Sequence, residues 1–267
     1  MRKEILTATT ALSCTLNYMP LAQASGHDGN VAVADTTFET TVSGLVVEDE
    51  FRFLTAGGIT FPVGNSFGVH VEGGVSFGEN NGGNNDWAAQ IAAVLFTRDP
   101  TIGEIGAFVS LIAFEDDLRP TVTMIGAEAE WYATDNHTLF GAAGIQLVDD
   151  NGFDNNDSRF FAGIGGSYYV TPNFKATLAG LFNDDAFSVS GGVEYQLQQP
   201  LFNIGAATRL FAKAIASEND NATFRFGVNF IFGGSGQSML YADRNELKHF
   251  YGSILTSQGI TPLEKFK

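Results

Sequence analysis

The sequence predicts an all-β protein: a closed antiparallel, transmembrane up-and-down β-barrel of about twelve strands. The composition excludes long helices, because 31 of the 267 residues are glycine and each glycine costs about 1 kcal/mol relative to alanine inside a helix. Apolar and polar side chains alternate along most of the chain, which is the period of a β-strand. Only 16% of the residues are charged, while 24 are phenylalanine.

The alternating segments are roughly ten to thirteen residues long, enough for tilted strands that cross a bilayer in about 9–11 residues. In the third segment, Phe67, Val69 and Val71 share one face, and polar or small residues occupy the other. The first segment (37–47) and the ninth (174–183) alternate least regularly, so ten strands is the alternative count. The segments lie at 37–47, 50–61, 66–78, 87–98, 103–114, 121–132, 137–148, 159–170, 174–183, 186–197, 203–214 and 222–232.

Two features favour a membrane barrel over a soluble β-sandwich, whose strands would also alternate. Aromatic residues such as Trp87, Trp131 and Phe232 gather at the ends of the apolar face, as they do at the two interfaces of membrane barrels. Charged and small residues share the other face, and closure leaves no strand edge in contact with hydrocarbon. A soluble secreted β-protein is the alternative that these features disfavour.

The chain divides into four expected segments. Residues 1–24 have the layout of a secretory signal peptide, with a basic start, an apolar middle and an Ala-Gln-Ala end; an ordinary disordered N-terminus is the alternative. Residues 25–36 are expected to form an N-terminal periplasmic segment and residues 37–232 the barrel. Residues 233–267 are expected to be a periplasmic C-terminal tail, either disordered or in contact with the barrel mouth or the cell wall. The single cysteine, Cys14, would leave with the signal peptide.

The connections between segments are of two kinds. Short ones with turn residues, such as Pro62 to Asn65, alternate with acidic, asparagine-rich ones, such as Asp149 to Ser158. Bacterial barrels have short periplasmic turns and longer external loops, so both ends of the barrel segment are expected on the periplasmic side. Residues 149–157 carry oxygen ligands that suit Ca²⁺ but lack the bidentate glutamate of an EF-hand loop, so no metal site is expected.

Alternation also assigns charged side chains to the interior, where Arg and Lys avoid the cost of about 2–4 kcal/mol that they would meet near the bilayer midplane. There they either pair across a filled interior or line a small polar channel. Inward glycines such as Gly144 and Gly165 are expected to leave room and so favour the channel. The expected lumen-lining residues are Arg52, His70, Glu72, Arg98, Glu128, Glu130, Arg159, Lys175, Glu194, Arg209, Lys213 and Arg225.

The last alternating segment carries Arg225, Gly227, Phe230 and Phe232. This pattern resembles the terminal-strand signal by which the outer-membrane barrel assembly machinery recognises its clients. Together with the strand rhythm up to Phe232, it makes the chain similar to small porin-like outer-membrane β-barrel proteins of Gram-negative bacteria. The resemblance implies an outer-membrane location, with membrane lipid and the assembly machinery as partners. Family members usually end on the final aromatic residue, whereas this chain continues to residue 267.

The predicted function is a narrow porin-like channel for small polar solutes or ions. The alternative is a closed structural or surface-interaction barrel without transport. A net charge of −16 argues against nucleic acid as a partner. The histidines His27, His70, His137 and His249 all fall away from the expected outer rim, where a catalytic histidine would be needed, so we expect neither enzymatic activity nor a cofactor.

Overall fold

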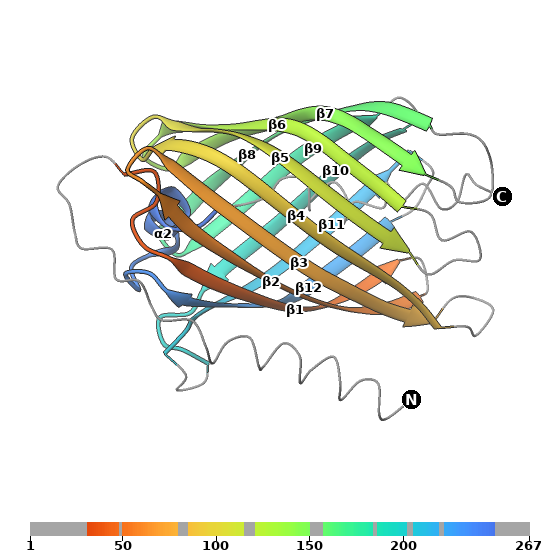
Figure 1. Ribbon diagram of the computed structural model, residues 1–267. Coiled ribbons are helices and arrows are strands. Elements are labelled where there is room, and N and C mark those ends of the chain that lie inside the picture. The colour runs from red at the N-terminus through yellow and green to blue at the C-terminus, as the bar shows by residue number, and fades with distance from the viewer. Residues whose placement is uncertain are drawn as a thin grey trace.

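The computed structural model describes residues 31–47, 50–79, 85–114, 121–149, 157–183, 186–201, 205–218 and 222–248. The chain forms a closed barrel of twelve antiparallel strands, which confirms the predicted fold class and the count of twelve. Each strand pairs with its neighbour in the sequence, and the first pairs with the last (Figure 1). The strands are β1 (Thr37–Val47), β2 (Glu50–Val63), β3 (Phe67–Glu79), β4 (Asn85–Asp99), β5 (Gly103–Phe114), β6 (Thr121–Thr134), β7 (His137–Asp149), β8 (Asp157–Thr171), β9 (Phe174–Asn183), β10 (Ala186–Gln196), β11 (Ala207–Ser217) and β12 (Ala222–Gly233).

We name the two ends of the barrel by their connections. The turn end carries the short turns after β2, β4, β6 and β8, together with the start of β1 and the end of β12; the opposite end is the loop end. The predicted signal peptide, residues 1–24, and most of the loop at 149–157 lie outside the described residues. Within the described part of the chain, no helix is long and apolar enough to span a membrane.

The outward face of the barrel is apolar and exposed. Ile164, in the middle of β8, is 75% exposed, and Leu178 and Ile105 on β9 and β5 are similarly uncovered. Trp87 and Trp131 lie exposed near strand ends on this same face. A continuous exposed apolar surface of this kind is the lipid-facing band of a membrane barrel.

The eleventh strand begins later than the sequence predicts. A strand at 203–214 was expected, whereas β11 spans Ala207–Ser217. The reason is local, because Pro200 has no amide hydrogen to donate and Gly205 adopts a φ of 70°, outside the β region. The alternation is unaffected, and Arg209 and Lys213 remain on the inward face.

The sequence predicted that inward glycines leave empty space in the interior, but the structure does not have this space. Each of several inward glycines instead stands directly opposite an inward phenylalanine on the next strand, whose ring covers it. This packing is the pairing by which an aromatic side chain shields a strand glycine. The pairs are Gly68 and Phe96, Gly126 and Phe108, Gly144 and Phe161, Gly165 and Phe140, and Gly227 and Phe211.

Replacing Gly126 with alanine is therefore expected to destabilise the barrel by about 1–3 kcal/mol. A Cβ at this position would lie 2.5 Å from the carbonyl oxygen of Ala143 and 2.8 Å from the Phe108 ring. Gly73→Ala is the matched control, since its Cβ would point outward and meet no atom closer than 3.5 Å. Urea unfolding in lipid vesicles measures both variants, and equal stabilities would contradict the expected close packing at Gly126.

Candidate functional site

The chain beyond β12 turns back into the barrel. We call residues 234–248 the plug; it contains the short helix α2 (Met239–Asn245), which lies within the barrel outline at the turn end (Figure 1). Met239, Leu247 and Lys248 are almost completely buried. The expected tail at 233–267 is thus described as far as residue 248, where it lies against the barrel interior.

Local sequence explains how the chain reverses and then forms a helix. Gly233, Gly234 and Gly236 adopt φ values of 77°, 70° and 67°, which glycine reaches without steric cost. Ser238 then caps α2, its side chain accepting a hydrogen bond from the backbone N–H of Tyr241. The helix buries Met239, Ala242 and Asp243, which share one face at spacings of three and four residues.

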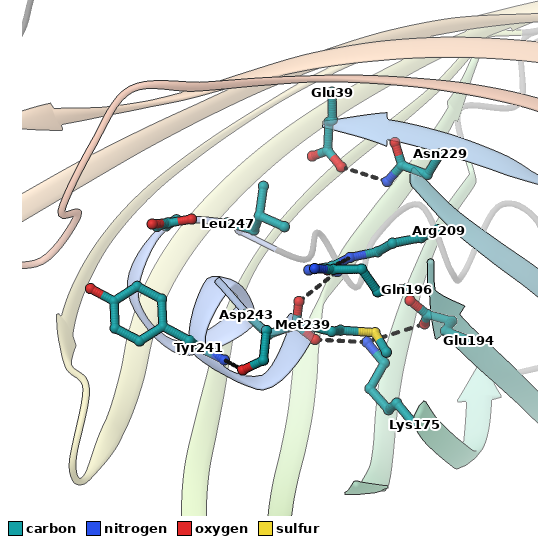
Figure 2. A network of polar contacts seen from close by, with 12 residues as sticks. Glu39, Lys175, Glu194, Gln196, Arg209, Asn229, Met239, Tyr241, Asp243 and Leu247 are labelled. Atoms are coloured by element: carbon teal, nitrogen blue, oxygen red, sulfur yellow. Dashed lines mark hydrogen bonds and ion pairs between the residues drawn. The ribbon is translucent and has the colours of Figure 1, made fainter. Parts of the chain in front are cut away.

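Asp243 anchors the helix to one wall of the barrel (Figure 2). Its carboxylate lies 3.0 Å from the Lys175 ammonium and 2.6 Å from the Arg209 guanidinium, and it accepts a hydrogen bond of 2.7 Å from the Tyr169 hydroxyl. Lys175 also contacts Glu194 at 3.1 Å. We call Asp243, Tyr169, Lys175 and Arg209 the aspartate cluster. Through it one residue of the plug bridges β8, β9 and β11.

Lys248 makes the complementary contact on another part of the wall. Its ammonium lies 2.5 Å from Glu104, 2.7 Å from Glu128 and 3.8 Å from Glu130. Arg98 lies 2.6 Å from Glu104 and donates a hydrogen bond to the backbone carbonyl of Leu247, next to Lys248. We call these five charged residues the lysine cluster. Two cations thus contact three buried carboxylates, which offsets most of the cost of removing these charges from water.

The pKa of Lys248 responds to both its burial and its neighbours. Burial by itself lowers the pKa of the ammonium, but attraction to Glu104, Glu128 and Glu130 outweighs burial and raises the pKa above its ordinary value. The side chain therefore remains protonated, and the charge that holds the plug is present at any physiological pH.

Neutral contacts complete the docking of the plug. Ala242 and Leu247 pack against Ile231 near the end of β12. Hydrogen bonds join the plug backbone to the turn end, from the Leu240 N–H to the carbonyl of Pro172 at 3.0 Å and from the Ala34 N–H to the carbonyl of Asn245 at 2.9 Å. A cavity of about 70 Å³ remains beside Asp243, between the plug and strands β6 to β10, and offers room for about two water molecules.

The two sides of the interior differ in how far they are filled. Along β4 to β9, inward apolar side chains pack against one another and are buried. Along β11, β12, β1, β2 and β3, charged or polar inward side chains such as Glu39, Arg52, Glu72, Lys213 and Arg225 keep partial solvent exposure. We call this second side the polar wall. The buried apolar cluster comprises Val33, Ala92, Val94, Phe96, Phe108, Ile112, Phe114, Val122, Met124, Phe140, Ala142, Val148, Phe161, Ala179 and Leu181.

The strand register places all twelve expected lumen-lining residues on the inward face. Six of them belong to the aspartate cluster or the lysine cluster, or contact one of these clusters directly: Arg98, Glu128, Glu130, Lys175, Glu194 and Arg209. The other six lie elsewhere on the inner surface: Arg52, His70, Glu72, Arg159, Lys213 and Arg225.

His70 is held in place rather than presented to solvent. It is fully buried, forms a hydrogen bond of 2.9 Å with Thr60 and lies 3.5 Å from Glu72. In the expected assembly signal, Arg225 and Gly227 of β12 face inward and Phe230 and Phe232 face outward, as the alternation requires.

Sequence reasoning missed Asp243 and Lys248 as members of an interior site. From the sequence, their tail segment was expected only to be disordered or to contact the barrel mouth or the cell wall. The sequence does contain a signal for this site. The tail carries an acid, Asp243, and a base, Lys248, five positions apart, and the expected lumen-lining residues include both cations and carboxylates that could pair with them.

No protein-family model matches the sequence, and no curated protein does. Solved structures resemble it at the level of fold. The COG4313 outer membrane channel from Pseudomonas putida F1 has a TM-score of 0.54 at 12% identity, over 78% of this chain and 99% of that one. The translocator domain of autotransporter NalP from Neisseria meningitidis has a TM-score of 0.53 at 12% identity, over 85% and 97%. The KdgM porin has a TM-score of 0.51 at 11% identity, over 73% and 99%. Identities this low show the fold alone, and they confirm the resemblance to porin-like outer-membrane barrels at that level.

Proposed function

We propose that the protein is a narrow outer-membrane channel for small polar solutes or ions, restricted at its turn end by its own plug. One observation carries the proposal: the polar wall keeps partly exposed charged side chains although the opposite side is packed with apolar ones. A barrel whose only task was to be stable would gain by filling both sides alike. The polar wall thus supports a passage that is narrower than the barrel itself.

A closed barrel without transport is the second candidate, and the plug is the observation that favours it. The aspartate and lysine clusters tie residues 239–248 to the wall from two directions. If the plug never moves, the turn end stays obstructed and the protein is structural. The two candidates therefore differ in whether solutes pass the plug.

The proposal includes the surroundings of the barrel. We place it in the outer membrane of a Gram-negative bacterium after export. Membrane lipid then contacts the exposed apolar band, and the barrel assembly machinery recognises β12. It has no catalytic role in this proposal.

Single-channel recording in planar bilayers tests the proposal. The full barrel is expected to show small conductance steps, and a variant ending at Gly233 is expected to show steps several-fold larger, because the turn end is then unobstructed. Heat-modifiable migration on gels controls for folding in both proteins. Absence of conductance above leak in both, with folding intact, would establish the closed barrel instead. Equal conductance in both would show that solutes pass without hindrance from the plug.

A further inference from the structure

We propose that Lys213 on β11 and Arg225 on β12 form a binding site in the lumen for a small solute that carries a carboxylate or phosphate group. The inference rests on the proposed channel function and names the chemical class of its solute. The two residues are direct partners in the antiparallel register, and both face inward. Like charges directly opposite each other destabilise a sheet, so their pairing calls for an anion between them.

Arg225 is oriented for such a ligand. Its Nε donates a hydrogen bond of 3.2 Å to the Ser43 hydroxyl, and its guanidinium lies over the Phe211 ring at 5.3 Å from the ring centroid. These contacts leave the two terminal nitrogens available, and a planar pair of N–H donors matches an oxyanion. On the other side of Arg225, Leu45 separates it from a third inward cation, Arg52, in the same hydrogen-bonded row.

The nearest acids of the interior have other partners. On the polar wall, Glu39 accepts a hydrogen bond of 3.1 Å from Asn229 and Glu72 lies beside His70. On the adjoining strand β10, Glu194 contacts Lys175. Within the described residues, neither Lys213 nor Arg225 makes an ion pair with a carboxylate, and both residues keep partial solvent exposure. The cations are therefore accessible from the lumen.

The barrel interior already binds a carboxylate nearer the turn end. Arg209 lies four residues before Lys213 on β11, about 13 Å along the strand, and with Lys175 it holds the carboxylate of Asp243. Side chains of the same two types, a lysine on β9 and an arginine on β11, thus already have a carboxylate between them. Lys213 and Arg225 repeat this combination of side chains, and no carboxylate of the described residues forms an ion pair with either.

Isothermal titration calorimetry of the full chain in neutral detergent at low ionic strength tests the site, with inorganic phosphate in one arm and citrate in the other. We expect wild-type protein to bind at least one of them. The double variant Lys213→Gln and Arg225→Gln should bind it at least about tenfold more weakly, because two charge-assisted contacts are lost. Arg159→Gln is the matched control, since it removes an inward charge four strands away from β12.

Binding in the phosphate arm alone assigns the solute to phosphate compounds, and binding in the citrate arm alone to carboxylates. Failure of the wild type to bind either anion, or an equal loss in Arg159→Gln, overturns the proposal. The single variants carry the test if the double variant loses its heat-modifiable migration. Because binding in detergent needs no conduction, a protein that binds but does not conduct disproves only the channel, and one that conducts but does not bind disproves only the site.

Discussion

Replacing Lys248 with methionine is expected to release the plug and to enlarge the single-channel conductance several-fold. The substitution removes the ammonium that contacts Glu104, Glu128 and Glu130, while Arg98 stays beside Glu104. Removing one partner from a buried ion pair costs about 3–5 kcal/mol, which is large for a docked segment of about fifteen residues. Hydrogen–deuterium exchange of the amides of α2 measures release directly, and planar-bilayer recording measures its consequence.

Arg244→Met is the control for this substitution. Arg244 is also a cation of the plug, but it lies at the rim, where it donates a hydrogen bond of 2.8 Å to the carbonyl of Thr134 and lies over the Tyr132 ring. An exposed contact of this kind contributes about 0–1 kcal/mol, so exchange and conductance should stay near those of the wild type. Unchanged exchange in Lys248→Met would show that the lysine cluster does not hold the plug.

Ile164→Arg is expected to destabilise the whole barrel by about 2–4 kcal/mol, the cost of an arginine on the lipid face near the bilayer midplane. Ile164 lies at the centre of β8, faces outward and is 75% exposed. Reversible urea unfolding in lipid vesicles measures the loss, and reduced heat-modifiable migration should accompany it.

Val170→Arg supplies the matched control, because Val170 also faces outward from β8 and is 52% exposed but lies one residue from the end of the strand. Near the interface the same substitution costs about 0–1 kcal/mol. Equal effects at both positions would mean that the outward band does not cross hydrocarbon, and would favour the soluble alternative.

Much of the architecture was predictable because a β-strand has a period of two that is written in local sequence. The alternation around Phe67, Val69 and Val71 predicts both the strand and its outward face, and the structure has β3 there. Turn residues predict the strand ends, except at β11, where the positive φ of Gly205 delays the strand. A positive φ at a glycine is allowed by the sequence but not required by it.

The contents of the interior depended on tertiary structure. Inward Gly126 and Phe108 are 18 positions apart in the sequence, and only the register of β5 with β6 brings the ring over the glycine. From the sequence alone, such inward glycines were expected to leave empty space. Arg98 and Leu247 are 149 positions apart and meet only because the barrel closes and the chain reverses after Gly233.

By itself, the sequence determined that this protein is a membrane barrel with charged residues turned inward, because alternation and the cost of charge in lipid act on each strand separately. Only the tertiary structure decided that residues 234–248 dock inside one end of the barrel, that Asp243 and Lys248 find partners on several strands, and that the polar wall keeps partial solvent exposure. These outcomes depend on which strands lie beside one another once the barrel has closed. Contacts between residues so far apart in the sequence produce no repeating pattern along the chain from which they could be predicted.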